Sequence, residues 1–203
     1  MTREALSEAA VVRAALAIIR RKGTAALTMR ELADALGVSP MAAYHHVQGK
    51  EDLLRLVGNH VWGSVTVPPP DSGPWYERLR TLVIAERDAI KRYRGLYEAL
   101  LYVDVEQKLV LEDAQLDLLL DTGCPPGRAV PAFRALRSWL GGNAFMESAL
   151  RDPSRRRAPS RWSKAQRLTY DRAVMPEMHA DDYFAAGLDV VIAGLRVTLG
   201  AER

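Results

Sequence analysis

Residues 28–50 read TMRELADALGVSPMAAYHHVQGK, and they carry the start and stop signals of two short helices. Thr28 precedes Glu31 by three residues, which is the pattern of a capping box, and apolar residues follow at helical spacing. Gly37 ends this helix, and Ser39 with the proline after it begins the next one. Two short helices joined by so tight a turn must cross steeply, which is the arrangement of a helix-turn-helix.

The second of these helices separates small apolar side chains from hydrogen-bond donors and flat rings. At about 100° per residue, Ala43 and Val47 lie on one side, and the opposite side carries Met41, Tyr44, His45 and Gln48. A helix that enters the DNA major groove requires such an outward face. Backbone N–H groups at the two helix starts, near Thr28 and Ser39, attract phosphate oxygens. The segment therefore predicts DNA binding.

Helices also flank this segment. Ser7 caps a first helix that Gly23 ends, and one face of it carries Ala9, Val12, Leu16 and Ile19. A fourth helix begins near Lys50. The stretch TVPPPDSGPW, residues 66–75, then breaks all regularity. We therefore predict a helix-turn-helix DNA-binding domain over residues 1–66 and a second domain over residues 75–203.

The second domain also shows helical spacing almost throughout, and strand signals are almost absent. We predict an all-α fold with a three-helix helix-turn-helix domain, a larger C-terminal helical bundle, and about nine to ten helices in all. Within the bundle the predicted helices span residues 75–90, 96–102, 105–121, 128–150, 163–174 and 181–199.

Composition excludes several classes of protein. The chain of 203 residues is 48% hydrophobic and 26% charged, which is ordinary for a globular protein. It lacks a run of about 18–20 apolar residues, its N-terminus is unlike a signal peptide, and its one cysteine, Cys124, fits a reducing compartment. We therefore expect a cytoplasmic protein without membrane contact. The net charge of +3 is too small to imply a polyanionic partner by itself.

Residues 27–54, LTMRELADALGVSPMAAYHHVQGKEDLL, resemble the signature of the tetracycline-repressor (TetR) family of bacterial regulators. The resemblance implies that Tyr44 and Lys50 contact phosphates, that Met41, Ala42 and His45 face base edges, and that Arg30 reaches a guanine. With the two capped helix starts and neighbouring positions, the predicted DNA-binding residues are Thr28, Arg30, Ser39, Pro40, Met41, Ala42, Tyr44, His45, His46 and Lys50.

Other interpretations of these residues remain open. Tyr44 is also compatible with a half-buried aromatic whose hydroxyl is satisfied, and Arg30 with an ion pair to Asp34 one turn later. His45 and His46 are neighbours, but adjacent helical residues point about 100° apart and cannot share an ion, so we expect no metal site there.

The C-terminal part has a weaker resemblance to the same family, in PWYERLR at residues 74–80 and DYFAAGLDVVIAGL at residues 182–195. It implies an effector pocket among the middle helices, for which the candidates are Trp62, Tyr97, Tyr102, Trp139, Phe145 and Met146. It also implies a homodimer built on the last two long helices, with Phe133, Leu140, Leu188, Val191, Ile192 and Leu195 in the interface. Both sets are equally compatible with the core of a single subunit.

We therefore predict a homodimeric, sequence-specific regulator, most simply a repressor that a small-molecule effector releases from a palindromic DNA operator. The alternative is a constitutive dimeric regulator, repressor or activator, without a ligand. A phosphate-binding glycine loop, a nucleophile elbow and clustered metal ligands are all missing from the sequence, so we expect neither an enzyme nor a cofactor.

Overall fold

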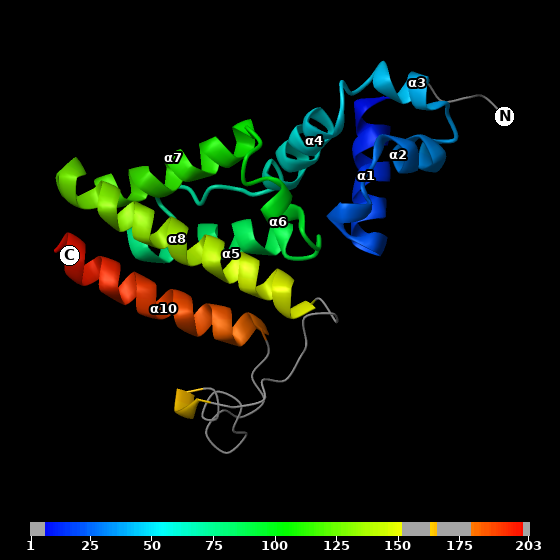
Figure 1. The fold of residues 1–203 in the computed structure, drawn as a ribbon. Coiled ribbons are helices and arrows are strands. Elements are labelled where there is room, and N and C mark those ends of the chain that lie inside the picture. Colours follow the sequence, from blue (N-terminus) through cyan, green and yellow to red (C-terminus); the bar gives the residue numbers. More distant parts are fainter. Residues whose placement is uncertain (1–6, 152–162, 166–179, 201–203) are drawn as a thin grey trace. The chain divides into compact units, whose positions relative to one another are not determined.

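The structure is a computed structural model that describes residues 7–151, 163–165 and 180–200. Within these residues the regular structure is helical and contains no strand, so the predicted all-α fold is confirmed (Figure 1). The helix predicted over residues 163–174 lies almost entirely outside the described residues. The described elements are α1 (Glu8–Lys22), the short 3₁₀ helix η1 (Thr24–Ala26), α2 (Met29–Leu36), α3 (Pro40–Tyr44), α4 (Lys50–Trp62), α5 (Trp75–Ile90), α6 (Leu96–Ala99), α7 (Glu106–Leu120), α8 (Pro126–Arg151) and α10 (Ala180–Leu199).

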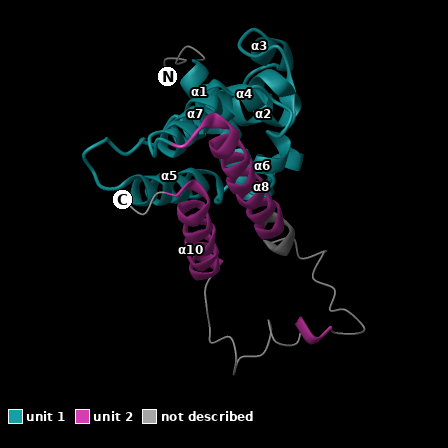
Figure 2. Cartoon of the chain, turned by 90° about the vertical axis from the view of Figure 1, so that its left-hand side faces the viewer, with its two compact units in different colours: residues 1–123 teal, residues 124–203 magenta. Residues whose placement is uncertain are grey.

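These elements form two compact units, residues 1–123 and residues 124–203 (Figure 2). The first unit contains α1 to α7, and the second contains α8 and α10. The irregular stretch 66–75 lies inside the first unit, where α4 packs against both α5 and α7. The division of the chain into functional domains at 1–66 and 75–203 stays a prediction.

Local signals explain the boundaries of the first helix. The Ser7 side chain accepts a hydrogen bond from the backbone N–H of Ala10 at 3.2 Å, and Gly23 ends α1 with a φ of +82°. The buried positions of α1 are Val11, Val12, Ala15, Leu16, Ile18 and Ile19. Ala9, which the predicted stripe included, is exposed, so the buried face begins two residues later, at Val11.

A small apolar core holds the helix-turn-helix together. Helix α1 packs against α2 and α4, and α2 packs against α3. The side chains that fill the space between them are fully or almost fully buried: Leu27, Leu32, Ala33, Ala43, Val47 and Leu53. Burial of one such leucine stabilises a fold by about 1.5–3 kcal/mol, so this core fixes how α3 is presented.

In the second unit, α8 packs against α10. The rings of Trp139 on α8 and Phe184 on α10 lie 5.0 Å apart, and a Cβ atom at Gly187 would lie 3.0 Å from the Trp139 ring. Gly187 therefore lets the two helices approach closely around the indole. None of the described helices is both long enough and apolar enough to cross a bilayer.

Candidate nucleic-acid interface

The turn between α2 and α3 is built by a glycine in the left-handed conformation. Gly37 has a φ of +65°, and its N–H donates to the carbonyl of Asp34 at 3.2 Å. The N–H of Val38 donates to the carbonyl of Ala33 at 3.1 Å. Together these bonds form a Schellman motif, which satisfies the last carbonyls of α2 and reverses the chain. The next helix can therefore begin at Pro40.

Side chains cap the starts of both helices, as predicted. The Thr28 hydroxyl accepts from the N–H of Glu31 at 3.1 Å, and the Ser39 hydroxyl accepts from the N–H of Ala42 at 3.2 Å. The carboxylate of Glu31 binds the ammonium group of Lys22 at the end of α1. This hydrogen bond lowers the pKa of Glu31 below its ordinary value. Glu31 therefore ties α2 to α1 and returns no hydrogen bond to the N–H of Thr28, so only the Thr28 half of the predicted capping box forms.

Helix α3 has the two faces that its sequence predicts. Ala43 and Val47 are buried, whereas Met41 is 70% exposed and Tyr44 is 47% exposed. The α-helix ends at Tyr44, and hydrogen-bonded turns continue the chain to Val47, whose N–H donates to the Ala43 carbonyl at 3.2 Å. Because Met41 is a large apolar side chain and is mostly exposed, it is available for contact with a binding partner.

The remaining predicted contact residues also lie at the surface. Ala42 is partly exposed, and the other seven are exposed: Thr28, Arg30, Ser39, Pro40, His45, His46 and Lys50. Arg30 and Asp34 both belong to the described part of the chain and form no ion pair, so the guanidinium is not held by that carboxylate. Among the described residues, no three His, Cys, Asp or Glu side chains gather as metal ligands.

The helix-turn-helix is anchored to the turn between α5 and α6. The carbonyl of Arg94 accepts from both the N–H and the hydroxyl of Thr24, at 3.0 and 2.9 Å. In return the Arg94 guanidinium donates to the carbonyl of Lys22 at 3.0 Å. These three hydrogen bonds connect the end of α1 and the start of η1 to Arg94 in the same unit.

Comparison with known proteins matches both parts of the chain. Residues 11–57 match the family described as "Bacterial regulatory proteins, tetR family", and residues 67–199 match "Tetracyclin repressor-like, C-terminal domain". Together the two matches span most of the sequence. This chain belongs to the tetracycline-repressor family. It is therefore a DNA-binding transcriptional regulator, as the sequence predicts.

Individual members of the TetR family show the same extent of similarity. The chain is 28% identical to the tetracycline repressor protein class C of Escherichia coli over 94% of this chain and 90% of that repressor. It is 29% identical to the class A repressor from transposon 1721, over 91% and 88% of the two chains. The crystal structure of TetR from Acinetobacter baumannii AYE has a TM-score of 0.75 and 26% identity, and covers 96% of this chain and 98% of that one.

The predicted pocket residues divide between the two units. In the first unit Trp62 is buried, Tyr97 is partly buried and Tyr102 is 94% exposed. In the second unit Trp139 is partly buried against Phe184, and the half-exposed residues are Phe145 and Met146. Each unit thus holds three of the six candidates, and their role in a pocket stays a prediction.

A buried polar pair between α5 and α7 was not predicted from the sequence. The Gln115 side chain, fully buried on α7, donates to the carboxylate of Glu86 on α5 at 2.6 Å, and Glu86 is itself only 2% exposed. Burial of such groups is costly unless they are hydrogen-bonded. Both residues stand at positions of an apolar stripe, and this break in the stripe was the available signal.

The predicted interface residues are mostly buried within the single chain. Leu140, Leu188, Ile192 and Leu195 are each no more than 6% exposed, so the intramolecular alternative describes their surroundings. Phe133 and Val191 are partly exposed. The apolar side chains that α8 and α10 expose are instead Val130, Tyr183, Val190 and Val197, together with Phe145 and Met146. A contact with a second subunit therefore has these side chains available.

Proposed function

We propose that this protein is a homodimeric repressor that binds a palindromic operator through α3 and is released from it by a small molecule. The observation that carries the proposal is the surface of α3, where Met41 and Tyr44 stand exposed above the buried Ala43 and Val47. Side chains on that surface are free to reach base edges, and the capped starts of α2 and α3 offer backbone N–H groups to phosphates.

We assign the predicted residues to two roles. Met41, Ala42 and His45 face base edges with Arg30, whereas Tyr44 and Lys50 bind phosphates. A single module of this size contacts few base pairs and discriminates weakly. Two copies related by a twofold axis read two half-sites, which is why a palindrome is expected.

Selection of bound duplexes from random DNA tests this proposal. We expect a palindrome, with half-sites about one helical turn apart. His45→Ala should lower affinity about five- to 150-fold for the selected sequence and relax the preference at the base pair it faces, because one good base contact contributes about 1–3 kcal/mol. His60→Ala is the matched control. His60 is an exposed histidine near the C-terminal end of α4, and this variant should bind DNA as the wild type does. Selection of no sequence preference would refute the proposal.

For the dimer we propose α8 and α10 as the contact surface, because the apolar Val190 and Val197 are 73% and 79% exposed there. A charged group in a subunit interface loses water without gaining a partner. Val190→Asp combined with Val197→Asp should therefore shift sedimentation from dimer to monomer. Val110→Asp, at a half-exposed valine on α7, is the control. An unchanged dimer in the double variant would refute this surface.

We propose that the effector binds in the part of the chain that follows α4. It binds more tightly to the state of the dimer in which the spacing of the two α3 helices does not fit DNA. A ligand shifts this equilibrium only as far as its preference for one state allows. Linkage then requires the two effects to be equal. Bound operator lowers the affinity for ligand by the same factor by which bound ligand lowers the affinity for operator. A screen that finds a ligand with equal affinity in the presence and absence of operator refutes release by that ligand. A screen without any ligand favours the constitutive regulator.

A further inference from the structure

Helix α4 comes very close to Val105, the residue that precedes α7 in the first unit. Gly58 on α4 is buried, and a Cβ atom placed there would lie only 2.9 Å from a methyl group of Val105 and 3.3 Å from Leu100. A glycine at this point lets the backbone of α4 approach the residue that precedes α7. The position of α4 is therefore sensitive to what happens at the start of α7.

At this contact the side chain of Asn59 serves as the cap of α7. The residue before the helix, Val105, has no side chain that can accept from the first N–H groups. The Asn59 oxygen accepts from the N–H of Gln107 at 3.1 Å, and the Asn59 amide donates to the carboxylate of Glu106. The bond from Asn59 lowers the pKa of Glu106, with a smaller contribution from the charge of Arg55. A residue of α4 thus satisfies one backbone donor in the first turn of α7, the N–H of Gln107.

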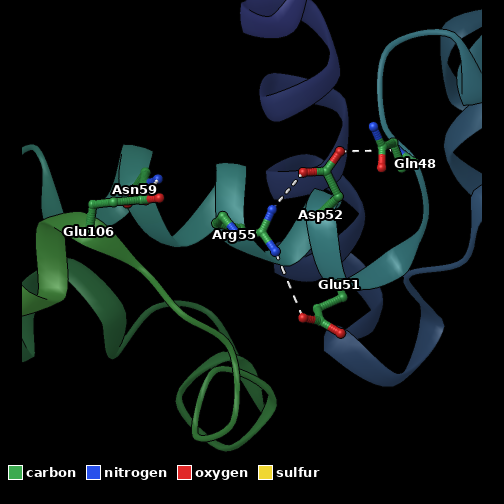
Figure 3. Close-up of polar contacts among 6 residues, drawn as sticks. All are labelled: Gln48, Glu51, Asp52, Arg55, Asn59 and Glu106. Carbon is green, nitrogen blue, oxygen red and sulfur yellow. Dashed lines mark hydrogen bonds and ion pairs between the residues drawn. The ribbon is translucent and has the colours of Figure 1, made fainter.

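The same face of α4 also holds the loop that follows α3 (Figure 3). The N–H of Gln48 donates to the Asp52 carboxylate at 3.0 Å, and that carboxylate accepts from Arg55 at 3.0 Å. Asp52, Arg55 and Asn59 are spaced by three and four residues, so they follow one another along one face. Polar contacts therefore form two groups on this face of α4, one at the loop after α3 and one at the first turn of α7, and Arg55 and Asn59 do not bond to each other.

We propose that Asn59 is a positioning residue that sets which half-site spacing the dimer accepts. The proposal rests on the proposed function, because it requires two α3 helices on one palindrome. By capping α7, Asn59 fixes the tilt of α4, and α4 carries the loop after α3. The nine helical steps from Lys50 to Asn59 span about 13 Å, so a tilt of about 10° around Asn59 would move the start of α4 by about 2 Å. One base pair displaces a half-site by about 3.4 Å, which is a similar distance.

The test uses the palindrome that the wild-type protein selects, and two versions of it with one base pair inserted or removed at the centre. We expect the wild type to prefer the selected spacing clearly. Asn59→Ala should reduce that preference about fivefold or more, whereas its affinity for a duplex with a single half-site should stay within twofold. Gln107→Ala is the matched control, because Asn59 binds the backbone of Gln107 and not its side chain.

A rescue separates this role from a general loss of structure. Asn59→Asp keeps an acceptor for the Gln107 N–H but places a carboxylate against Glu106, so it should also relax the spacing preference. Adding Glu106→Gln reverses donor and acceptor and should restore the preference. If Asn59→Ala keeps the spacing preference of the wild type, or if the double variant has no stronger preference than Asn59→Asp, the role of Asn59 is overturned and the proposed function is not. Selection of no palindrome by the wild type overturns the proposed function, and the role of Asn59 with it.

Discussion

The close contact between α4 and α7 makes Gly58→Ala informative in two backgrounds. In the wild type the new methyl group would lie 2.9 and 3.0 Å from the two methyl groups of Val105. Valine is stiff at χ1, so it cannot turn away freely. Overpacking of this kind costs about 1–3 kcal/mol, and the gain in helix propensity from glycine to alanine offsets about 1 kcal/mol. The net destabilisation should therefore be about 1 kcal/mol.

In the Val105→Ala background the same substitution should change sign. The two methyl groups are gone, and the end of Leu100, at 3.3 Å, can shift by the few tenths of an ångström that are required. Only the propensity gain then remains, so Gly58→Ala should stabilise by about 1 kcal/mol. The expected coupling between the two positions is the difference between these effects, about 2 kcal/mol.

Urea denaturation of the four proteins measures this coupling as a double-mutant cycle. The protein concentration must be the same for all four, because the stability of a dimer depends on it. The cost of Val105→Ala itself cancels in the cycle. Independent sites add within about 0.3–0.5 kcal/mol, so a coupling below that limit would refute the tight contact between α4 and α7.

Three further predictions concern the helix-turn-helix. Lys50→Ala should weaken binding to all duplexes alike and reduce the slope of log affinity against log salt by about 0.9, measured by titration at several salt concentrations; a loss that depends on sequence contradicts phosphate binding. Ser39→Ala removes the acceptor for the Ala42 N–H and should lower the free energy of unfolding by about 1 kcal/mol in urea, and an unchanged value contradicts the cap. The pKa of Glu31 is lowered in the folded state, so its ionised carboxylate stabilises the fold at a pH above the unfolded-state pKa, near 4.5. This stabilisation is lost as the pH falls through the folded-state pKa. Glu31→Gln should remove that pH-dependent loss from the free energy of unfolding measured against pH.

The helix-turn-helix was predictable because its signals are local. Thr28 and Ser39 accept from N–H groups three residues later, and Gly37 adopts the left-handed conformation that ends α2. In each of these interactions the donor and the acceptor lie within about five residues of each other in the sequence, so the local sequence predicts the bond. The partner of the Glu31 carboxylate was not predictable in this way, because Lys22 belongs to the preceding helix.

The sequence left open, for a different physical reason, whether the apolar face of the last helix packs within its own subunit or against a second one. Leu188, Ile192 and Leu195 form a regular apolar face on α10, and such a face packs equally well against its own subunit or another one. In the structure the face is buried within the chain, and Val190 and Val197 on the other side of α10 are exposed. Helical periodicity identifies which residues share a face but carries no information on which protein chain covers it.

The start of α7 shows that a missing local signal is itself informative. Val105, the residue before this start, supplies no side chain that caps the helix, yet the first N–H groups of a helix need an acceptor. The acceptor for the Gln107 N–H comes from another element: it is the side-chain oxygen of Asn59, three residues before the end of α4. The same helix α4 also holds the loop after α3, through the hydrogen bond from the N–H of Gln48 to Asp52. On the proposed role of Asn59, a tilt of α4 would strain its hydrogen bond to the N–H of Gln107, so the preferred half-site spacing and the first turn of α7 should change together.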